Sequence, residues 1–107
     1  MLMDPMKQVI AGKSYNTETA TKLAEAGAGL GYSDFKHWYE ILYRTKKGAY
    51  FLAGYGGPMT RWARPAQGGG TTGSEGIRVL TEQEAREWVE RYDNDKYETI
   101  FGNAPEA

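Results

Sequence analysis

The residues that most resemble a chemical motif are Gly68–Gly73, whose letters match the dinucleotide-binding pattern G-x-G-x-x-G. That pattern works when the loop joins a strand to a helix N-terminus that holds the pyrophosphate. Here the residues that follow, Ile77–Leu80, predict a strand, and the lysine of a phosphate-binding loop is missing before Ser74. A small nucleotide-binding protein or enzyme that uses this loop is therefore only our third functional hypothesis.

The titratable side chains do not single out a catalytic group. His37 is the single histidine, so a Ser-His-Asp or histidine-metal site would have to be built on it. Carboxylates can act without histidine, but no spacing selects a pair among Glu40, Glu75, Glu82 and Glu84. Asp93–Asp95 starts like a calcium loop yet lacks the required Gly and Glu. With no cysteine either, we expect no catalytic residue, no metal and no cofactor.

Basic residues near an aromatic side chain suggest a second hypothesis, a nucleic-acid-binding accessory protein. Charge and base stacking together can hold a single strand. The candidate residues are Arg44, Lys46, Lys47, Arg61 and Arg64, with Trp62 between the last two. Against this stand a net charge of −1 and a pI near 5.8, because proteins that grip nucleic acid are usually basic.

The composition predicts one domain over residues 1–107, located in the cytoplasm. Charged residues make up 25% of the chain and hydrophobic residues 40%, and no apolar run approaches the roughly 18 residues of a membrane helix. The chain has three Trp, eight Tyr and three Phe. So many aromatic side chains in a small domain predict some at the surface, where they favour protein partners. We expect residues 1–5 and 103–107 to be frayed and residues 66–76 to form a mobile, glycine-rich loop.

The stretch 37–57 predicts a β-hairpin around which the domain is built. Two aromatic-rich runs flank Thr45–Gly48, and Gly48 suits the left-handed position after a type I turn. This register places opposed residues at numbers that sum to 94. One face then carries no charge and is predicted to face the core; it holds Tyr39, Ile41, Tyr43 and Phe51. The other face, with Trp38, Leu42, Tyr50 and Leu52, is either covered by a helix or is a working surface.

The remaining elements predict an α+β fold, in which two helices pack on a small antiparallel sheet. Residues 7–15 predict two short strands around a turn at Ala11–Gly12. Residues 17–26 predict a thin helix after an N-cap at Asn16 or Thr17. Residues 82–92 predict the main helix, since Thr81 and Glu84 form a capping box. A short turn of helix is expected at 59–64 and another at 97–101.

Several ordered motifs together resemble a family of small proteins carried by bacteriophages and other mobile elements. The matching pieces span about residues 7–102 and include Ile10–Tyr15, Leu42–Gly48, Gly54–Gly57, Leu80–Ala85 and Ile100–Gly102. The resemblance implies a context in which small phage proteins bind and block host defence systems, as anti-CRISPR proteins do.

The leading hypothesis is therefore a non-enzymatic phage protein in the host bacterial cytosol. It would bind a bacterial defence protein, such as a CRISPR effector, and inhibit it by occupying a surface. The predicted partner-binding residues are aromatic, apolar and basic, and they come from the hairpin and the following segment: Trp38, Arg44, Lys46, Lys47, Tyr50, Leu52, Arg61, Trp62 and Arg64.

Overall fold

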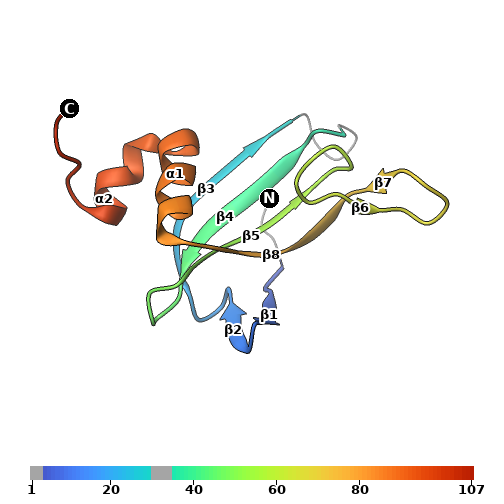
Figure 1. The fold of residues 1–107 in the computed structure, drawn as a ribbon, viewed down its shortest axis with the longest axis horizontal. Helices are drawn as coiled ribbons and strands as arrows, with labels where there is room; N and C mark the ends of the chain where they lie inside the picture. Colours follow the sequence, from blue (N-terminus) through green and yellow to red (C-terminus); the bar gives the residue numbers. More distant parts are fainter. Residues whose placement is uncertain (1–3, 30–34) are drawn as a thin grey trace.

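The computed structural model describes residues 4–29 and 35–107 and shows a sheet-dominated α+β fold (Figure 1). A four-stranded antiparallel sheet has the order β3-β4-β5-β8. Its strands are β3 (Thr21–Ala28), β4 (Trp38–Arg44), β5 (Tyr50–Gly56) and β8 (Ser74–Leu80). The α+β class predicted from the sequence is confirmed at this level. Within the described ranges, no helix is long and apolar enough to cross a membrane.

The central hairpin β4–β5 has the predicted register. Trp38 pairs with Gly56, Leu42 with Leu52 and Arg44 with Tyr50. Its turn is closed by hydrogen bonds from Gly48 N–H to the Thr45 carbonyl and from Thr45 N–H to the Ala49 carbonyl. Gly48 has φ +92°, which is the left-handed conformation that this turn requires. Local turn chemistry was therefore sufficient to set the register.

The helix predicted over residues 17–26 is wrong. Thr17–Ala20 forms a turn, and the chain continues as strand β3 along the edge of β4. The Asn16 side chain does accept a backbone N–H, that of Glu18, but it closes a turn and caps no helix. Pairing with β3 satisfies the backbone groups of β4 in the buried sheet, and this tertiary demand outweighs a weak helix propensity.

The short N-terminal hairpin is confirmed. Strands β1 (Lys7–Ile10) and β2 (Lys13–Asn16) pair around Ala11 and Gly12. Both turn residues have positive φ, +52° and +78°, as a two-residue hairpin turn requires. The hairpin covers part of one face of the large sheet, where the ring of Tyr15 meets Phe51 edge-on at 5.6 Å.

Helix α1 (Glu82–Tyr92) covers the opposite face of the sheet, as Figure 1 shows. The predicted capping box is present: the Thr81 hydroxyl accepts the Glu84 N–H, and the Glu84 carboxylate accepts the Thr81 N–H. The Thr81 backbone N–H, followed by the Thr81 side chain, lowers the pKa of the Glu84 carboxyl below its ordinary value. A 3-10 turn, η1 (Asn94–Lys96), leads to α2 (Tyr97–Phe101), the short helix that the sequence predicts.

The core lies on both faces of the central hairpin. The larger cluster packs under α1 and includes Leu42, Tyr50 and Leu52. The smaller cluster packs under the β1–β2 hairpin and includes Phe51 and Ala53. The prediction that the uncharged face makes the core was thus incomplete. The charged face is buried more extensively because its acidic residue, Glu40, has hydrogen-bond partners inside the protein.

The segment between β5 and β8 contains turns and one small hairpin. The helical turn predicted at 59–64 is absent; two hydrogen-bonded turns replace it, from Thr60 N–H to the Gly57 carbonyl and from Ala63 N–H to the Thr60 carbonyl. Strands β6 (Arg64–Pro65) and β7 (Thr71–Thr72) pair beyond these turns and project from the end of the sheet away from α1 (Figure 1). Residues 66–76 do not form one continuous loop as predicted, because Thr71–Thr72 is β7 and β8 begins at Ser74; their mobility stays a prediction.

Two glycines that pair across β5 and β8 offer a matched stability test. A Cβ on Gly54 would lie 2.6 Å from Trp62 Cζ2, whereas a Cβ on Gly76 would meet its nearest atom, Trp62 Cζ3, at 3.7 Å. We expect Gly54→Ala to lower the free energy of unfolding by about 1–3 kcal/mol, since Trp62 must shift. Gly76→Ala should change it by less than about 1 kcal/mol. Urea denaturation measures both, and equal effects would contradict this packing.

Candidate functional site

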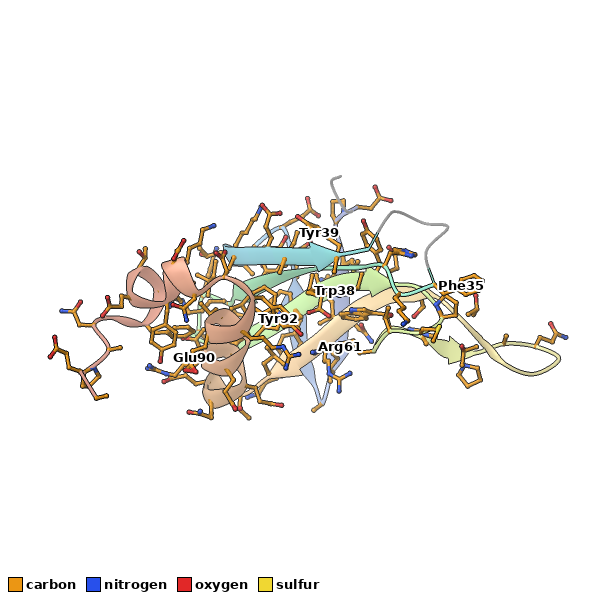
Figure 2. All side chains as sticks on the ribbon, turned by 90° about the horizontal axis from the view of Figure 1, so that it is seen from above. Phe35, Trp38, Tyr39, Arg61, Glu90 and Tyr92 are labelled. Carbon is orange, nitrogen blue, oxygen red and sulfur yellow. The ribbon has the colours of Figure 1, made fainter. Side chains whose placement is uncertain are left out.

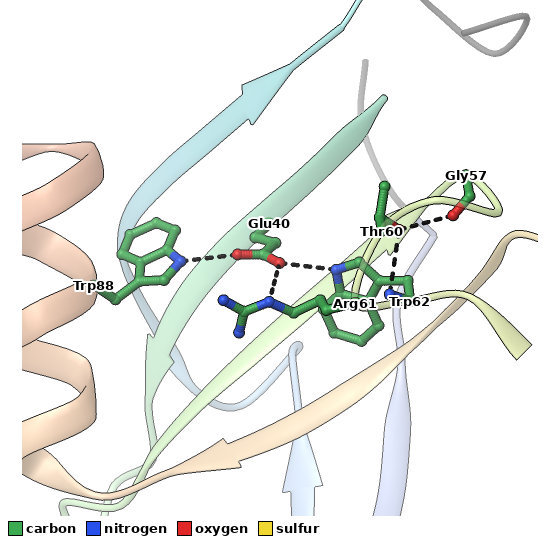
Figure 3. A network of polar contacts seen from close by, with 6 residues as sticks. All are labelled: Glu40, Gly57, Thr60, Arg61, Trp62 and Trp88. Atoms are coloured by element: carbon green, nitrogen blue, oxygen red, sulfur yellow. Dashed lines mark hydrogen bonds and ion pairs between the residues drawn. The ribbon is translucent and has the colours of Figure 1, made fainter. Parts of the chain in front are cut away.

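The most unusual group in the structure is a buried carboxylate, Glu40, in the middle of β4. Its residue surface is only 2% exposed. Trp88 Nε1 donates to one carboxylate oxygen and Trp62 Nε1 to the other, each at 2.8 Å. The Arg61 guanidinium adds an ion pair, with Nε 3.3 Å from the oxygen that Trp62 also binds. Figure 3 shows Glu40 at the centre of these contacts.

The two tryptophans reach Glu40 from different parts of the chain. Trp88 projects from α1. Trp62 comes from the segment after β5, where the Thr60 hydroxyl donates to the Gly57 carbonyl and accepts the Trp62 N–H (Figure 3). The Trp62 ring lies over Gly54, directly opposite Glu40 across the β4–β5 pair. The absence of a side chain at Gly54 therefore makes room for the indole.

These contacts give Glu40 a structural role. Both of its oxygens accept hydrogen bonds, and Arg61 supplies the opposite charge, so the burial of the carboxylate is compensated. Glu40 also belongs to the lining of a neighbouring surface hollow, but its two oxygens are engaged by the indole and guanidinium donors. It joins the sheet, the helix α1 and the 57–63 segment. We name this cluster, Glu40 with Arg61, Trp62 and Trp88, the Glu40 clasp.

A surface hollow lies directly beside the Glu40 clasp. It has a volume of about 290 Å³, and its lining includes Trp38, Met59, Arg61 and Tyr92. The rings of Trp38 and Tyr92 meet edge-on with centroids 5.0 Å apart, and Figure 2 shows the two side chains together near Arg61. A second hollow of about 520 Å³ adjoins it and shares Arg61 and Tyr92.

Two large apolar side chains stand exposed near the first hollow. Phe35 is 64% exposed and Met59, in the lining of the hollow, is 63% exposed. Their backbones are joined by a hydrogen bond of 3.0 Å from Met59 N–H to the Phe35 carbonyl. We call the set Phe35, Trp38, Met59, Arg61 and Tyr92 the aromatic surface. It combines exposed apolar area with a cation and a preformed hollow.

The structure divides the predicted partner-binding residues. Tyr50 and Leu52 are 8% and 0% exposed and lie in the core under α1, so they do not form the predicted docking surface. Trp62 is also buried, at 7%. The sequence left open whether this hairpin face was covered by a helix, and α1 covers it. Trp38 and Arg61 remain at the surface, half-buried and exposed respectively.

The basic candidates do not form one patch. Lys46 and Lys47 precede β5, whereas Arg61 and Arg64 follow it. A seven-residue strand is roughly 20 Å long, so the two groups start from opposite ends of β5. Arg44 is half-buried at the end of β4 next to the lysine turn. A single nucleic-acid track over these residues therefore has no support in the fold.

Sequence reasoning missed three members of the aromatic surface: Phe35, Met59 and Tyr92. Tyr92 lies at the last turn of α1 and stays half-buried. Phe35 and Met59 lie outside regular elements, where no periodicity indicates exposure. The fold brings Met59 to the hollow that Trp38 lines, whereas Phe35 lies three residues before Trp38 in the chain.

The other candidate motifs are not assembled into sites. The Gly68–Gly70 run has positive φ throughout and connects β6 to β7, so no helix N-terminus follows it to hold a phosphate. Glu75 lies on the sheet face opposite Glu40, since it pairs with Tyr55 and Glu40 pairs with Gly54. Over residues 4–29 and 35–107, no three His, Asp or Glu side chains are grouped so as to hold a metal ion.

Comparison of the chain with protein-family models, with characterised proteins and with solved structures finds no match. The resemblance to phage proteins therefore rests on the ordered motifs alone.

The Glu40 clasp makes a direct prediction about stability. In Glu40→Gln, a single amide oxygen replaces the two carboxylate oxygens, so only one of the two indole N–H groups keeps its acceptor. The N–H group of the second indole then faces the amide N–H₂, which is also a donor. We expect the free energy of unfolding to fall by about 1–3 kcal/mol, because one buried N–H loses its acceptor. The control is Glu75→Gln, which removes an exposed carboxylate of the same sheet and should change stability by less than about 0.5 kcal/mol. Chemical denaturation measures both variants.

A double-mutant cycle with Trp62→Phe would show whether the contact itself is responsible. Trp62→Phe removes the donor of the Glu40–Trp62 hydrogen bond and Glu40→Gln removes its charged acceptor, so the two effects should fall short of additivity by about 0.5–3 kcal/mol. Strict additivity would show that Glu40 and Trp62 do not interact as the structure indicates.

Proposed function

We propose that this chain is a non-enzymatic binding protein that docks on a partner protein through the aromatic surface. The observation that carries the proposal is the exposure of Phe35 and Met59, 64% and 63%, beside a hollow lined by Trp38 and Tyr92. Exposed apolar side chains that cluster, as opposed to scattered ones, are typical of interaction sites.

The composition of the aromatic surface fits a binding hot spot. Trp, Tyr and Arg are the residue types that carry most binding energy in protein interfaces, and Met is also enriched there. The hollow beside Trp38 has a volume of about 290 Å³, which suits a protruding side chain of a partner better than a large cofactor. Arg61 at its edge, with a side chain 38% exposed, can meet a carboxylate or carbonyl of the partner.

The Glu40 clasp supports binding by holding this surface in place. Arg61 is tied to Glu40, and its neighbour Trp62 is buried and hydrogen-bonded to the same carboxylate. Trp38 rests on Tyr92, whose ring in turn lies 5.5 Å from that of Trp88. Side chains that are already ordered lose less entropy on association. A surface built in this way can bind without rearranging.

The nature of the partner follows from the resemblance to small proteins of bacteriophages and mobile elements. On that basis we propose that the chain acts in the cytosol of a bacterial host and inhibits a defence protein, such as a CRISPR effector, by covering a surface that the effector needs. This inhibition requires no chemistry by the bound protein.

The test compares one double variant at two exposed residues with a matched control. Phe35→Ser combined with Met59→Ser removes the apolar part of the aromatic surface without touching the core. Val9→Ser is the control, because Val9 is 65% exposed and lies on β1. Each protein is expressed in bacteria that carry a CRISPR system, and phage plating is counted. We expect wild type and Val9→Ser to restore plating and the double variant to lose at least about tenfold of that effect.

Calorimetry with the purified effector then tests whether the double variant loses inhibition because it binds the effector more weakly. The double variant should bind at least about tenfold more weakly than wild type, with unchanged circular dichroism. Full inhibition and full binding by the double variant would refute the aromatic surface as the docking site. Absence of any effect of wild type on several CRISPR effectors would refute the proposed class of partner.

A further inference from the structure

A second cavity lies away from the aromatic surface, where the N-terminal hairpin meets the β4–β5 turn. Its volume is about 570 Å³, within the range of about 300–1,000 Å³ that is usual for small-molecule sites. One wall comes from β2 and the turn after it, and the other from Thr45–Ala49. We propose that this cavity binds a small molecule that carries a phosphate or pyrophosphate group.

The first reason is charge. Lys13, Lys46 and Lys47 all line the cavity, and within the described part of the chain no Asp or Glu side chain lines it. Nor does any of the three lysines pair with a described carboxylate. Three lysines in one lining give this surface a local excess of positive charge, which a bound anion of two or more charges neutralises.

The second reason is the hydrogen-bonding chemistry of the other lining residues. Ser14, Thr19 and Thr45 also line the cavity, and the Thr19 hydroxyl already donates to the Asn16 carbonyl. Thr45 Oγ1 accepts the Ala49 N–H at 3.0 Å, so its own proton is available to donate. Phosphate oxygens accept hydrogen bonds from ammonium and hydroxyl groups alike, and the bonds to charged donors are the stronger ones. Cations and neutral donors in one lining therefore match an oxyanion.

The third reason is that the walls are ordered without a ligand. The Thr45–Ala49 turn is closed by backbone bonds of 2.8 and 2.9 Å, and Ala20 N–H bonds to the Asn16 carbonyl at 3.1 Å on the other wall. Tyr15, 7% exposed, also lines the cavity, and its ring is held edge-on against Phe51. A preformed cavity of this kind reduces the entropy lost on binding.

Lysines at turn tips also serve to keep strand edges soluble. That explanation accounts for each lysine separately, but it does not require the lysines of two hairpins to converge on one cavity. A small phosphorylated molecule is favoured over a nucleic-acid strand because the basic residues meet at a bounded cavity and do not continue as a track toward Arg61 and Arg64.

The experiment is a calorimetric titration of the full chain with sodium pyrophosphate at constant ionic strength. We expect saturable binding by the wild type, and a weakening of about 3- to 10-fold for each of Lys13→Gln, Lys46→Gln and Lys47→Gln. The matched control is Lys7→Gln, because Lys7 is an exposed lysine of the same hairpin outside the cavity lining. It should bind as the wild type does. All four positions are exposed, and circular dichroism checks that the variants fold.

Three results would overturn the proposal. The first is no binding of pyrophosphate by the wild type at millimolar concentration. The second is equal weakening by Lys7→Gln, which would indicate a general effect of charge. The third is tight binding of a single-stranded oligonucleotide that depends on the same lysines while pyrophosphate fails to compete, which would indicate a nucleic-acid site. None of the lysines belongs to the aromatic surface, so this test and that of partner binding succeed or fail independently.

Discussion

The structure depends on how one buried charge is accommodated. Glu40 lies in the centre of the sheet at 2% exposure, and it is held by two indole N–H groups and an arginine. Those partners come from α1 and from the segment after β5, so satisfying the carboxylate also fixes how both elements sit on the sheet. An unpaired buried carboxylate would destabilise the fold. With all its hydrogen-bond partners present, the same carboxylate favours one arrangement of α1 and the 57–63 segment on the sheet.

The same arrangement creates the surface to which we assign binding. Arg61 pairs with Glu40 and also lines the hollow. The ring contacts from Trp88 to Tyr92 and from Tyr92 to Trp38 connect the buried cluster to the surface. Phe35 and Met59 then extend the apolar area into solvent. Stability and the proposed binding therefore depend on the same contacts, since weakening the Glu40 clasp would also loosen the aromatic surface.

The lysine cavity lies on different elements. It is bounded by two turns whose backbone hydrogen bonds are complete, so its lysines can change without disturbing the core. The two surfaces, one apolar and aromatic and one basic, are separate, so the two kinds of binding that we propose are independent of each other.

Local patterns determined much of the fold. The turn after Thr45, the two-residue turn at Ala11–Gly12 and the capping box of α1 were all predictable, because each depends on residues within a few positions of one another. Tertiary structure decided the rest. Residues 21–28 form a strand because they pair with β4 and satisfy its backbone hydrogen-bonding groups. Glu40 is buried because two tryptophans, 22 and 48 residues away in the chain, donate hydrogen bonds to its carboxylate. The exposure of Phe35 and Met59 and the meeting of three lysines also depend on long-range packing, which residue spacing does not encode.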